Sequence, residues 1–256
     1  MPAVAFRVVS ALLLAIAAGS SLAQGWPSKP IRWIVPYPPG GSDDIATRTV
    51  TERLTRMLGQ AVVVENRPGA TGTIGAEYVA KSTADGYTVL SGSDAMTSVP
   101  HLYSKLGFDP LKDFVPVTQL TRQPVLLAAH PSLGVNSVAE LVGLAKMNPG
   151  LAYASGGGSG SPQHMVAEWF ASLAGIKGLI LEQWYGVFVP AGTSKEIVGR
   201  LNAGTVQALA DPKIRERYAQ SGLEPVGGTS EQFAAVVRAD YDKYGRLIRE
   251  LKITVD

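Results

Sequence analysis

Apolar and polar positions along the chain follow two periods, one typical of buried strands and one typical of amphipathic helices. Residues 31–35 (IRWIV) form a short, nearly continuous apolar run that ends in prolines and glycines, as a buried strand does before a turn. Apolar residues then recur at helical spacing over 46–58, with Ser42 or Asp43 as the candidate cap and Gly59 as the candidate left-handed stop. The pattern therefore predicts a strand, a glycine turn and a helix.

The same order of elements continues to the end of the chain. Further strands are predicted at 62–64, 87–90, 124–129, 151–154 and 184–190. Further helices are predicted at 74–81, from the capping box Ser137–Glu140 to Pro149, along the apolar stripe of 165–173, and at 195–210, 212–220 and 231–251. Alternation of this kind favours an α/β fold with a largely parallel sheet covered by helices.

An apolar run near the N-terminus predicts an export signal. Arg7 is the only charged residue before the run 8–18, which is too short to span a membrane, since a spanning helix needs about 20 apolar residues. The small residues of 21–23 predict cleavage before Gln24. We therefore expect residues 1–23 to be a signal peptide, which leaves 256 − 23 = 233 residues, enough for one large or two small domains.

Composition excludes several classes of function. Cysteine is absent, so disulfides, thiolate zinc sites and a cysteine nucleophile are excluded. The formal net charge is +2 and no long run of like charge occurs, which makes nucleic acid an unexpected partner. The three histidines, His101, His130 and His164, stand far apart in the sequence, so neither a metal site nor another cofactor is predicted.

Three glycine-rich turns precede predicted helices and are candidate anion sites. They are Gly40-Gly41-Ser42, Gly69-Ala70-Thr71-Gly72 and the run from Gly156 to Ser161. The first backbone N–H groups of a helix have no partner within the helix, and the positive end of the helix dipole lies behind them. Such a turn binds anions, although each glycine has the alternative role of making a tight turn. The occurrence of three such turns favours the anion sites.

The same turns bear on other kinds of chemistry. No glycine loop ends in lysine followed by serine or threonine, and Ser161 stands where a dinucleotide-binding turn needs glycine. Ser159 misses the spacing of a nucleophile elbow, but Ser159 with His164 leaves a serine hydrolase as an alternative. His164 either donates to a bound anion or faces solvent. Asp44 either complements the helix dipole or orders water or a ligand atom in an anion site.

Four blocks of the sequence carry a resemblance to a known family. The blocks are VPYPPGGSDDIATR at 35–48, ENRPGATGTIGAEYVAKSTADGYTVL at 65–90, LAYASGGGSGSPQHMVAEWF at 151–170 and WYGVFVPAGT at 184–193. They resemble the receptors of tripartite tricarboxylate transporters, often called Bug proteins. With the signal peptide and the C-terminal helices, the resemblance covers nearly the whole chain.

The resemblance implies a two-domain periplasmic binding-protein fold of type II-like α/β architecture that closes on its ligand by a hinge. We expect a periplasmic monomer that binds a small carboxylate, performs no catalysis, and delivers the ligand to the membrane components of the transporter. Residues 24–122 and 183–256 would form the first domain and 123–182 the second. The ligand-binding positions that the resemblance implies are Tyr37, Pro39, Gly40, Gly41, Ser42, Asp44, Ala70, Thr71, Gly72, Ser93, Ser155, Gly158, Ser159, Gly160 and His164.

The sequence departs from the family between Leu173 and Trp184. Relatives carry a substantial segment of the second domain there, and both flanks of the gap match well, so an internal deletion is the interpretation. A second domain made of residues 123–182 alone would have few strands, little buried apolar area and an exposed sheet edge. The hypothesis is that the first domain folds as in relatives while the second is incomplete. The alternative to a receptor is then a remnant that no longer binds.

Overall fold

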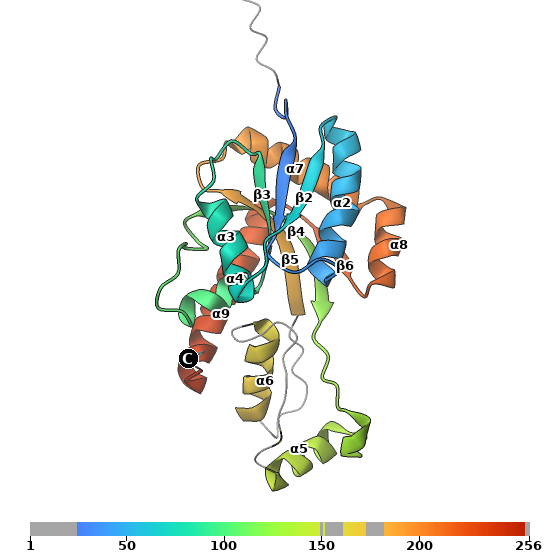
Figure 1. Cartoon of the computed structure of the whole chain (residues 1–256), viewed down its shortest axis with the longest axis vertical. Helices are drawn as coiled ribbons and strands as arrows, with labels where there is room; N and C mark the ends of the chain where they lie inside the picture. The colour runs from blue at the N-terminus through green and yellow to red at the C-terminus, as the bar shows by residue number, and fades with distance from the viewer. Residues whose placement is uncertain (1–24, 149–150, 152–160, 173–181, 254–256) are drawn as a thin grey trace, which may run out of the picture.

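A mixed sheet forms the centre of the molecule (Figure 1). The computed structural model describes residues 25–148, 151, 161–172 and 182–253. The six strands of the sheet stand in the order β2-β1-β3-β5-β4-β6. Their bounds are β1 Ile31–Val35, β2 Val62–Asn66, β3 Thr88–Ser93, β4 Phe114–Pro124, β5 Glu182–Pro190 and β6 Glu224–Gly227.

Strand direction divides the sheet into two parts. β1 pairs in parallel with both β2 and β3, as predicted. β5 runs antiparallel to both of its neighbours, β3 and β4, and β6 runs antiparallel to β4. The prediction of a largely parallel sheet is therefore wrong beyond β3. The excursion that starts at the end of β4 returns to the sheet at the same end, where Pro124 pairs with Glu182, so β4 and β5 run antiparallel.

The helices confirm the predicted helical segments to within a few residues at their ends. The longer ones are α2 Ser42–Leu58, α3 Thr73–Ala80, α5 Val138–Met147, α6 Pro162–Ser172, α7 Lys195–Leu209, α8 Pro212–Gln220 and α9 Ser230–Leu251. Gly59 ends α2 in the left-handed conformation with φ 67°, as expected. The predicted caps Ser42 and Asp43 are wrong, because Gly41 is the N-cap and both residues lie inside the first turn.

Two apolar layers cover the sheet. On one face Leu54 of α2, Leu201 of α7 and Tyr218 of α8 pack against buried strand residues such as Trp33. On the other face α3 and α9 pack against the sheet together with the short helix α4 (Ala95–Ser98). Right-handed crossovers from β1 to β2 and back to β3 place α2 and α3 on opposite faces. The result is a three-layer α/β/α body.

The longest strand of the body differs from the sequence-based expectation. β4 carries polar residues along its length, and its pairing with β5 shifts register between Pro116 and Thr118 and again between Gln119 and Thr121. These irregularities break the alternation by which a strand is recognised. The predicted strand at 124–129 is wrong, since only Pro124 belongs to β4 and the chain that follows is not in a strand.

A smaller part of the chain extends from one end of the body (Figure 1). The chain leaves the sheet at Pro124 and re-enters it at Glu182, and these two residues are partners in the β4–β5 pairing. Between them, α6 packs on α9, where Met165 is buried with Tyr244 and Ile248. In contrast, α5 has no buried residue. Across the described ranges, none of the helices has the length and apolar character that crossing a membrane requires.

Candidate functional site

The topology of the sheet creates one crevice at its carboxyl edge. The chain leaves β1 toward α2 on one face and leaves β3 toward α4 on the other, while β1 and β3 are neighbours in the sheet. In open α/β sheets, ligands bind where adjacent strands send their chains to opposite faces. The residues that follow β1, β2 and β3 are therefore the candidate site, and they include the first two glycine turns.

Tyr37 and Ser93 meet in this crevice. Tyr37 follows β1, Ser93 ends β3, and their side-chain oxygens lie 2.6 Å apart in a hydrogen bond. Burial raises the pKa of the Tyr37 phenol, so the hydroxyl stays protonated and remains a donor at physiological pH. Two residues that the resemblance places in the site, 56 positions apart, are thus in direct contact.

The first glycine turn leads directly into α2. Gly40 adopts φ 83°, which favours glycine, and Gly41 caps the helix in an extended conformation. Ile45 is the first residue of α2 whose N–H bonds back, to the Gly41 carbonyl. Among the described residues, none accepts a hydrogen bond from the backbone N–H of Ser42, Asp43 or Asp44. Three donors at the positive end of a 17-residue helix therefore lack an acceptor in the described part of the chain, and Ser42 is the exposed residue among them, since Asp43 and Asp44 are 1% and 4% exposed.

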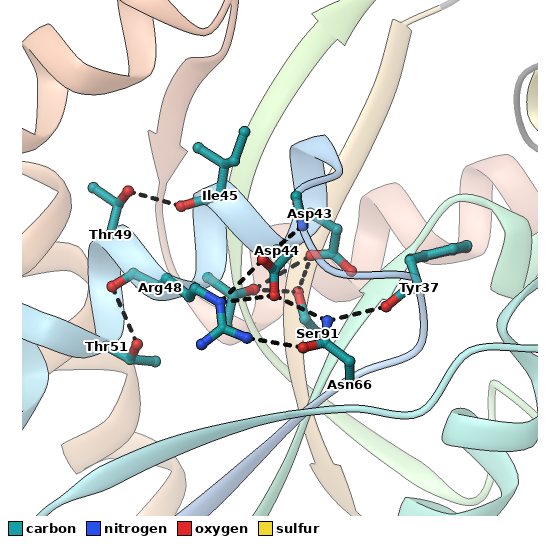
Figure 2. A network of polar contacts seen from close by, with 11 residues as sticks. Tyr37, Asp43, Asp44, Ile45, Arg48, Thr49, Thr51, Asn66 and Ser91 are labelled. Atoms are coloured by element: carbon teal, nitrogen blue, oxygen red, sulfur yellow. Dashed lines mark hydrogen bonds and ion pairs between the residues drawn. The ribbon is translucent and has the colours of Figure 1, made fainter.

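The Asp44 carboxylate is held by donors from three elements (Figure 2). It accepts hydrogen bonds from the Gly40 N–H at 3.0 Å, from Arg48 Nε at 2.9 and 3.0 Å, and from Asn66 Nδ2 at 2.9 Å. Asn66 also donates to the Tyr37 carbonyl at 3.0 Å and accepts from Arg48 Nη2 at 2.8 Å. Although burial opposes it, the bonds from Arg48, Gly40 and Asn66 together hold the pKa of Asp44 below its usual value. The geometry favours a structural role for Asp44, which fixes the first turn to the end of β2.

Asp43 has the opposite environment, although it is the preceding residue. Its side chain is 1% exposed, and its Oδ1 accepts from Ser91 and, at 3.4 Å, from Thr47. Oδ2 has no partner among the described residues. Burial raises the pKa of Asp43 from 3.8 to about 8, against the hydrogen bonds from Ser91 and Thr47. Asp43 is therefore a neutral acid at pH 7, so it does not cancel the positive end of α2.

The second glycine turn is conformationally strained. Ala70 and Thr71 have φ of 46° and 56°, between Gly69 at 132° and Gly72 at 90°. Two consecutive non-glycine residues in the left-handed region cost of the order of 1 kcal/mol each. Strain of this kind is concentrated at ligand sites, and this turn starts α3 beside Tyr37.

A pocket lies beside the second turn, between Tyr37 and the end of β3. It is partly open to solvent, and its enclosed volume is only about 10 Å³, room for about one water molecule. Its lining consists of Pro36, Tyr37, Thr71, Gly72, Thr73, Ala76, Ser93, Met96, Val99 and Phe108. Four of the predicted residues, Tyr37, Thr71, Gly72 and Ser93, line it. The other predicted residues of the two turns, Pro39, Gly40, Gly41, Ser42, Asp44 and Ala70, lie in the adjoining loops and first helix turn.

The third predicted loop is only partly described. Ser155, Gly158, Ser159 and Gly160 lie outside the described residues, so their placement stays a prediction. Ser161 is buried and accepts from the His164 N–H at the start of α6. His164 Nε2 lies 3.7 Å from Glu168 Oε1. In the parts of the chain that the structure describes, no group of histidine and acidic residues is arranged to hold a metal ion.

Several residues of the site carry no functional signal in the sequence. Met96, Val99 and Phe108 belong to a loop and helix whose pattern is that of ordinary core positions, yet they line the pocket. The sequence suggests only a capping role for Asp43. Its pairing with Ser91 joins residues 48 positions apart, which no local pattern reveals.

The mixed α/β sheet, with helix starts gathered at its carboxyl edge, has the fold of periplasmic binding proteins. The fold matches that of a periplasmic binding protein named BugD, with a TM-score of 0.79, 24% identity and coverage of 89% of this chain and 99% of that one. A structure of Rpa4515 of R. palustris with adipate has a TM-score of 0.84 and 26% identity, with coverage of 90% of this chain and 100% of that one.

The family follows from the sequence model that matches the chain. The family described as "Tripartite tricarboxylate transporter family receptor" matches residues 46–180 and 171–253, which is most of the chain. This chain belongs to that family. Among curated relatives, a UPF0065 protein from the tcbD-tcbE intergenic region of Pseudomonas sp. strain P51 is 28% identical, with coverage of 98% of this chain and 95% of the relative.

The length of this alignment bears on the missing segment. It extends over 320 positions, whereas this chain has 256 residues, so at least 320 − 256 = 64 positions of the alignment are gaps in this chain. The family match is itself divided into two segments that meet at 171–180. The gaps agree with an internal deletion, and the division of the family match agrees with its expected place between Leu173 and Trp184.

Proposed function

We propose that the chain is a periplasmic receptor that captures a small carboxylate at the carboxyl edge of β1 and β3 and delivers it to the membrane components of a tripartite transporter. The observation that carries this proposal is the set of backbone N–H groups of Ser42, Asp43 and Asp44 at the start of α2, for which the described residues offer no acceptor. The adjacent Asp43 is uncharged at neutral pH, and Asp44 is paired with Arg48. An incoming carboxylate therefore meets donors without an uncompensated negative charge.

The comparisons support the class of ligand and the compartment. Rpa4515, whose structure contains adipate, has the same fold at 26% identity. The family is one of solute receptors, and the proposal assigns no catalysis to this chain. An exported monomer with a signal peptide at 1–23 fits this role, and no nucleic acid or cofactor takes part.

Ligand capture has a direct test in thermal unfolding. A carboxylate that binds the folded state raises the free energy of unfolding by mass action, by about 2.7 kcal/mol at a ligand concentration of a hundred times Kd. The melting temperature rises with it. We expect such a rise for at least one member of a panel of monocarboxylates, dicarboxylates, tricarboxylates and aromatic acids, followed by calorimetric titration. Gly41→Val is expected to weaken binding by about tenfold or more, because its side chain stands over the N–H groups.

Gly41→Val is suited to this test because the fold tolerates it. Gly41 has an ordinary φ of −73°, and a Cβ there would meet only the Pro38 carbonyl oxygen, at 3.6 Å. The ligand-free variant should therefore melt close to the wild type. Full affinity in this variant would remove the first turn from the site, and the absence of any carboxylate response in the wild type would favour the remnant.

We further propose that the chain has two domains, 24–122 with 183–256 and an incomplete 123–182. The smaller part contains α5, which buries no residue and exposes Val138 by 57% and Met147 by 75%. At least 64 alignment positions are gaps in this chain, and a loss of residues next to α5 would leave such a surface uncovered. The deletion accounts for both features.

Limited trypsin digestion of the mature chain tests this division. We expect the first cut after the exposed Lys146 at the end of α5, before any cut in α2, because cleavage requires local opening and α5 has little packing to lose. Mass spectrometry of the early fragments identifies the site. Digestion that leaves 123–182 intact while the body is cut would contradict an incomplete second domain.

A further inference from the structure

A buried tyrosine of β5 reaches the start of α2. Tyr185 is the register partner of Ser93, the last residue of β3, and it packs in the apolar layer on the α2 face of the sheet. Tyr185 is 7% exposed, and its hydroxyl forms a hydrogen bond with the side chain of Ser42. Ser42 is the exposed residue in the first turn of α2. A strand distant in sequence thus contacts the exposed residue of the first glycine turn.

The buried side of the Tyr185 hydroxyl is held by side-chain amides. Gln123 Nε2 donates to Gln183 Oε1 at 2.9 Å and to the Tyr185 hydroxyl oxygen at 3.4 Å. Gln163 of α6 donates to the same Gln183 oxygen at 2.9 Å. An amide nitrogen can only donate, so the Tyr185 oxygen is an acceptor on its buried side. The phenol proton is then left for Ser42.

This direction of donation leaves the Ser42 proton without a partner in the described part of the chain. Burial raises the pKa of the Tyr185 phenol, so the hydroxyl keeps its proton at neutral pH. When Tyr185 donates to Ser42 Oγ, the proton of Ser42 has to find another acceptor, and no described residue supplies one. That proton lies beside the backbone donors at the start of α2.

We propose that Tyr185 is a positioning residue, which directs the hydroxyl proton of Ser42 toward the ligand carboxylate at the start of α2. The inference rests on the proposed function, because Ser42 belongs to the proposed carboxylate site. Gln123 donates to Tyr185 and Tyr185 donates to Ser42, so each bond polarises the next. An exposed serine alone would divide its hydroxyl among rotamers and water, whereas the bond from Tyr185 holds it as a donor to the ligand.

Tyr185→Phe tests this inference, because it removes one oxygen and keeps the buried ring. Adipate is the probe, replaced by the acid of the panel with the lowest Kd where adipate does not bind. Calorimetric titration at pH 7 is expected to give a Kd about tenfold higher than that of the wild type. Tyr218→Phe is the matched control and should leave Kd unchanged. Tyr218 is also a buried tyrosine bonded to α2, but it donates to the Ala46 carbonyl, away from the start of the helix.

A double-mutant cycle with Ser42→Ala separates positioning from a general effect on the fold. Ser42→Ala should itself raise Kd by about tenfold, and adding Tyr185→Phe to it should raise Kd no further, because the residue through which Tyr185 acts is gone. Gln123→Leu, which removes the donor behind Tyr185, is a second variant. It should raise Kd severalfold in the wild type and have no effect in Ser42→Ala.

The outcomes distinguish this inference from the function on which it rests. An unchanged Kd in Tyr185→Phe, or an equal rise with and without Ser42, overturns the positioning role while carboxylate capture stands. An equal rise in Tyr218→Phe overturns it too, since the cause would be a general loosening of α2. Failure of every acid of the panel to bind the wild type overturns carboxylate capture and this inference with it. A rise in Tyr185→Phe that disappears in Ser42→Ala supports both.

Discussion

Asp43→Asn is expected to raise the free energy of unfolding at pH 8, and Asp44→Asn is expected to lower it, although the two acids are neighbours in the first turn of α2. The unfolded pKa of each is close to 3.8. In the folded protein, burial raises the pKa of Asp43 to about 8, whereas Arg48, Gly40 and Asn66 hold that of Asp44 below its usual value. The two pKa shifts have opposite signs, so the two substitutions have opposite effects.

The pH dependence follows from proton counts in the two states. Between about pH 4 and pH 8 the folded protein keeps a proton on Asp43 that the unfolded chain releases, so the contribution of Asp43 to stability falls as pH rises through this window. Asparagine carries no charge in the folded or the unfolded state, so the substitution removes this decrease in stability with rising pH. We expect the free energy of unfolding of Asp43→Asn to exceed that of the wild type by more than about 1 kcal/mol at pH 8, with a smaller difference at pH 5.

Asp44 behaves in the opposite way. Because its pKa is lowered in the folded protein, the ionised Asp44 carboxylate stabilises the fold above about pH 4. This stabilisation is lost as pH falls through the pKa of the folded state. Replacing it by Asn leaves the Gly40 N–H and Arg48 without their charged acceptor, at a cost of about 1–3 kcal/mol at neutral pH. Because Arg48 is half-exposed, we expect a value in the lower part of this range.

Urea unfolding of both variants and the wild type at pH 5, 7 and 8 measures these differences. The signature is a stability difference between Asp43→Asn and wild type that grows with pH, beside a loss in Asp44→Asn that is present at all three values. A destabilised Asp43→Asn at pH 8 would mean that Asp43 is ionised and paired in the folded protein.

Gly186→Val is expected to destabilise the body by about 3 kcal/mol or more. Gly186 lies in the middle of β5, between β3 and β4, and a Cβ at this position would come within 2.0 Å of Phe233 Cζ. Phe233 is 1% exposed and packs on Trp184 with ring centroids 5.1 Å apart, so its ring has no free space to enter. Overpacking of this size forces the strand or α9 to move.

Gly199→Ala in α7 is the matched control. No atom lies within 4 Å of a Cβ built there, and the position is helical, so we expect a gain of up to about 1 kcal/mol. The double variant Gly186→Val/Phe233→Ala should lose less stability than the sum of the losses in the two single variants, because the smaller side chain removes the clash. A double-mutant cycle measures this difference. Equal stability of Gly186→Val and wild type would contradict the close packing of β5 on α9.

The fold can be predicted where each element carries its own pattern. Residues 31–35 are apolar at nearly every position, and α9 has a stripe that includes Phe233 and Tyr244, so both elements are recognisable in the sequence. β4 is not, because Pro116 and the register shifts beside it interrupt its alternation. The reversed direction of β5 depends on where a long excursion returns to the sheet, and no residue of β5 encodes that locally.

The candidate site, like the fold, can be predicted from the sequence only in part. The turn residues Gly40, Gly41 and Gly72 are predictable, because glycine clustered before a helix indicates either a tight turn or a close approach of the backbone to a ligand. The roles of the two acids are not predictable, because an acid in a first helix turn is favourable in any protein. Only the contact with Ser91, from a distant strand, distinguishes the buried Asp43 from an exposed acid at the same position of the helix.

The pairing of Pro124 with Glu182 has a consequence for how this family changes length. Because the excursion begins and ends on adjacent residues of two paired strands, its removal would leave two ends that a tight hairpin turn joins without disturbing β4 or β5. The body thus has an insertion point between β4 and β5, where a change in the length of the segment leaves the order of the strands unchanged. A body with residues 125–181 replaced by Asn-Gly is the minimal scaffold that this architecture defines.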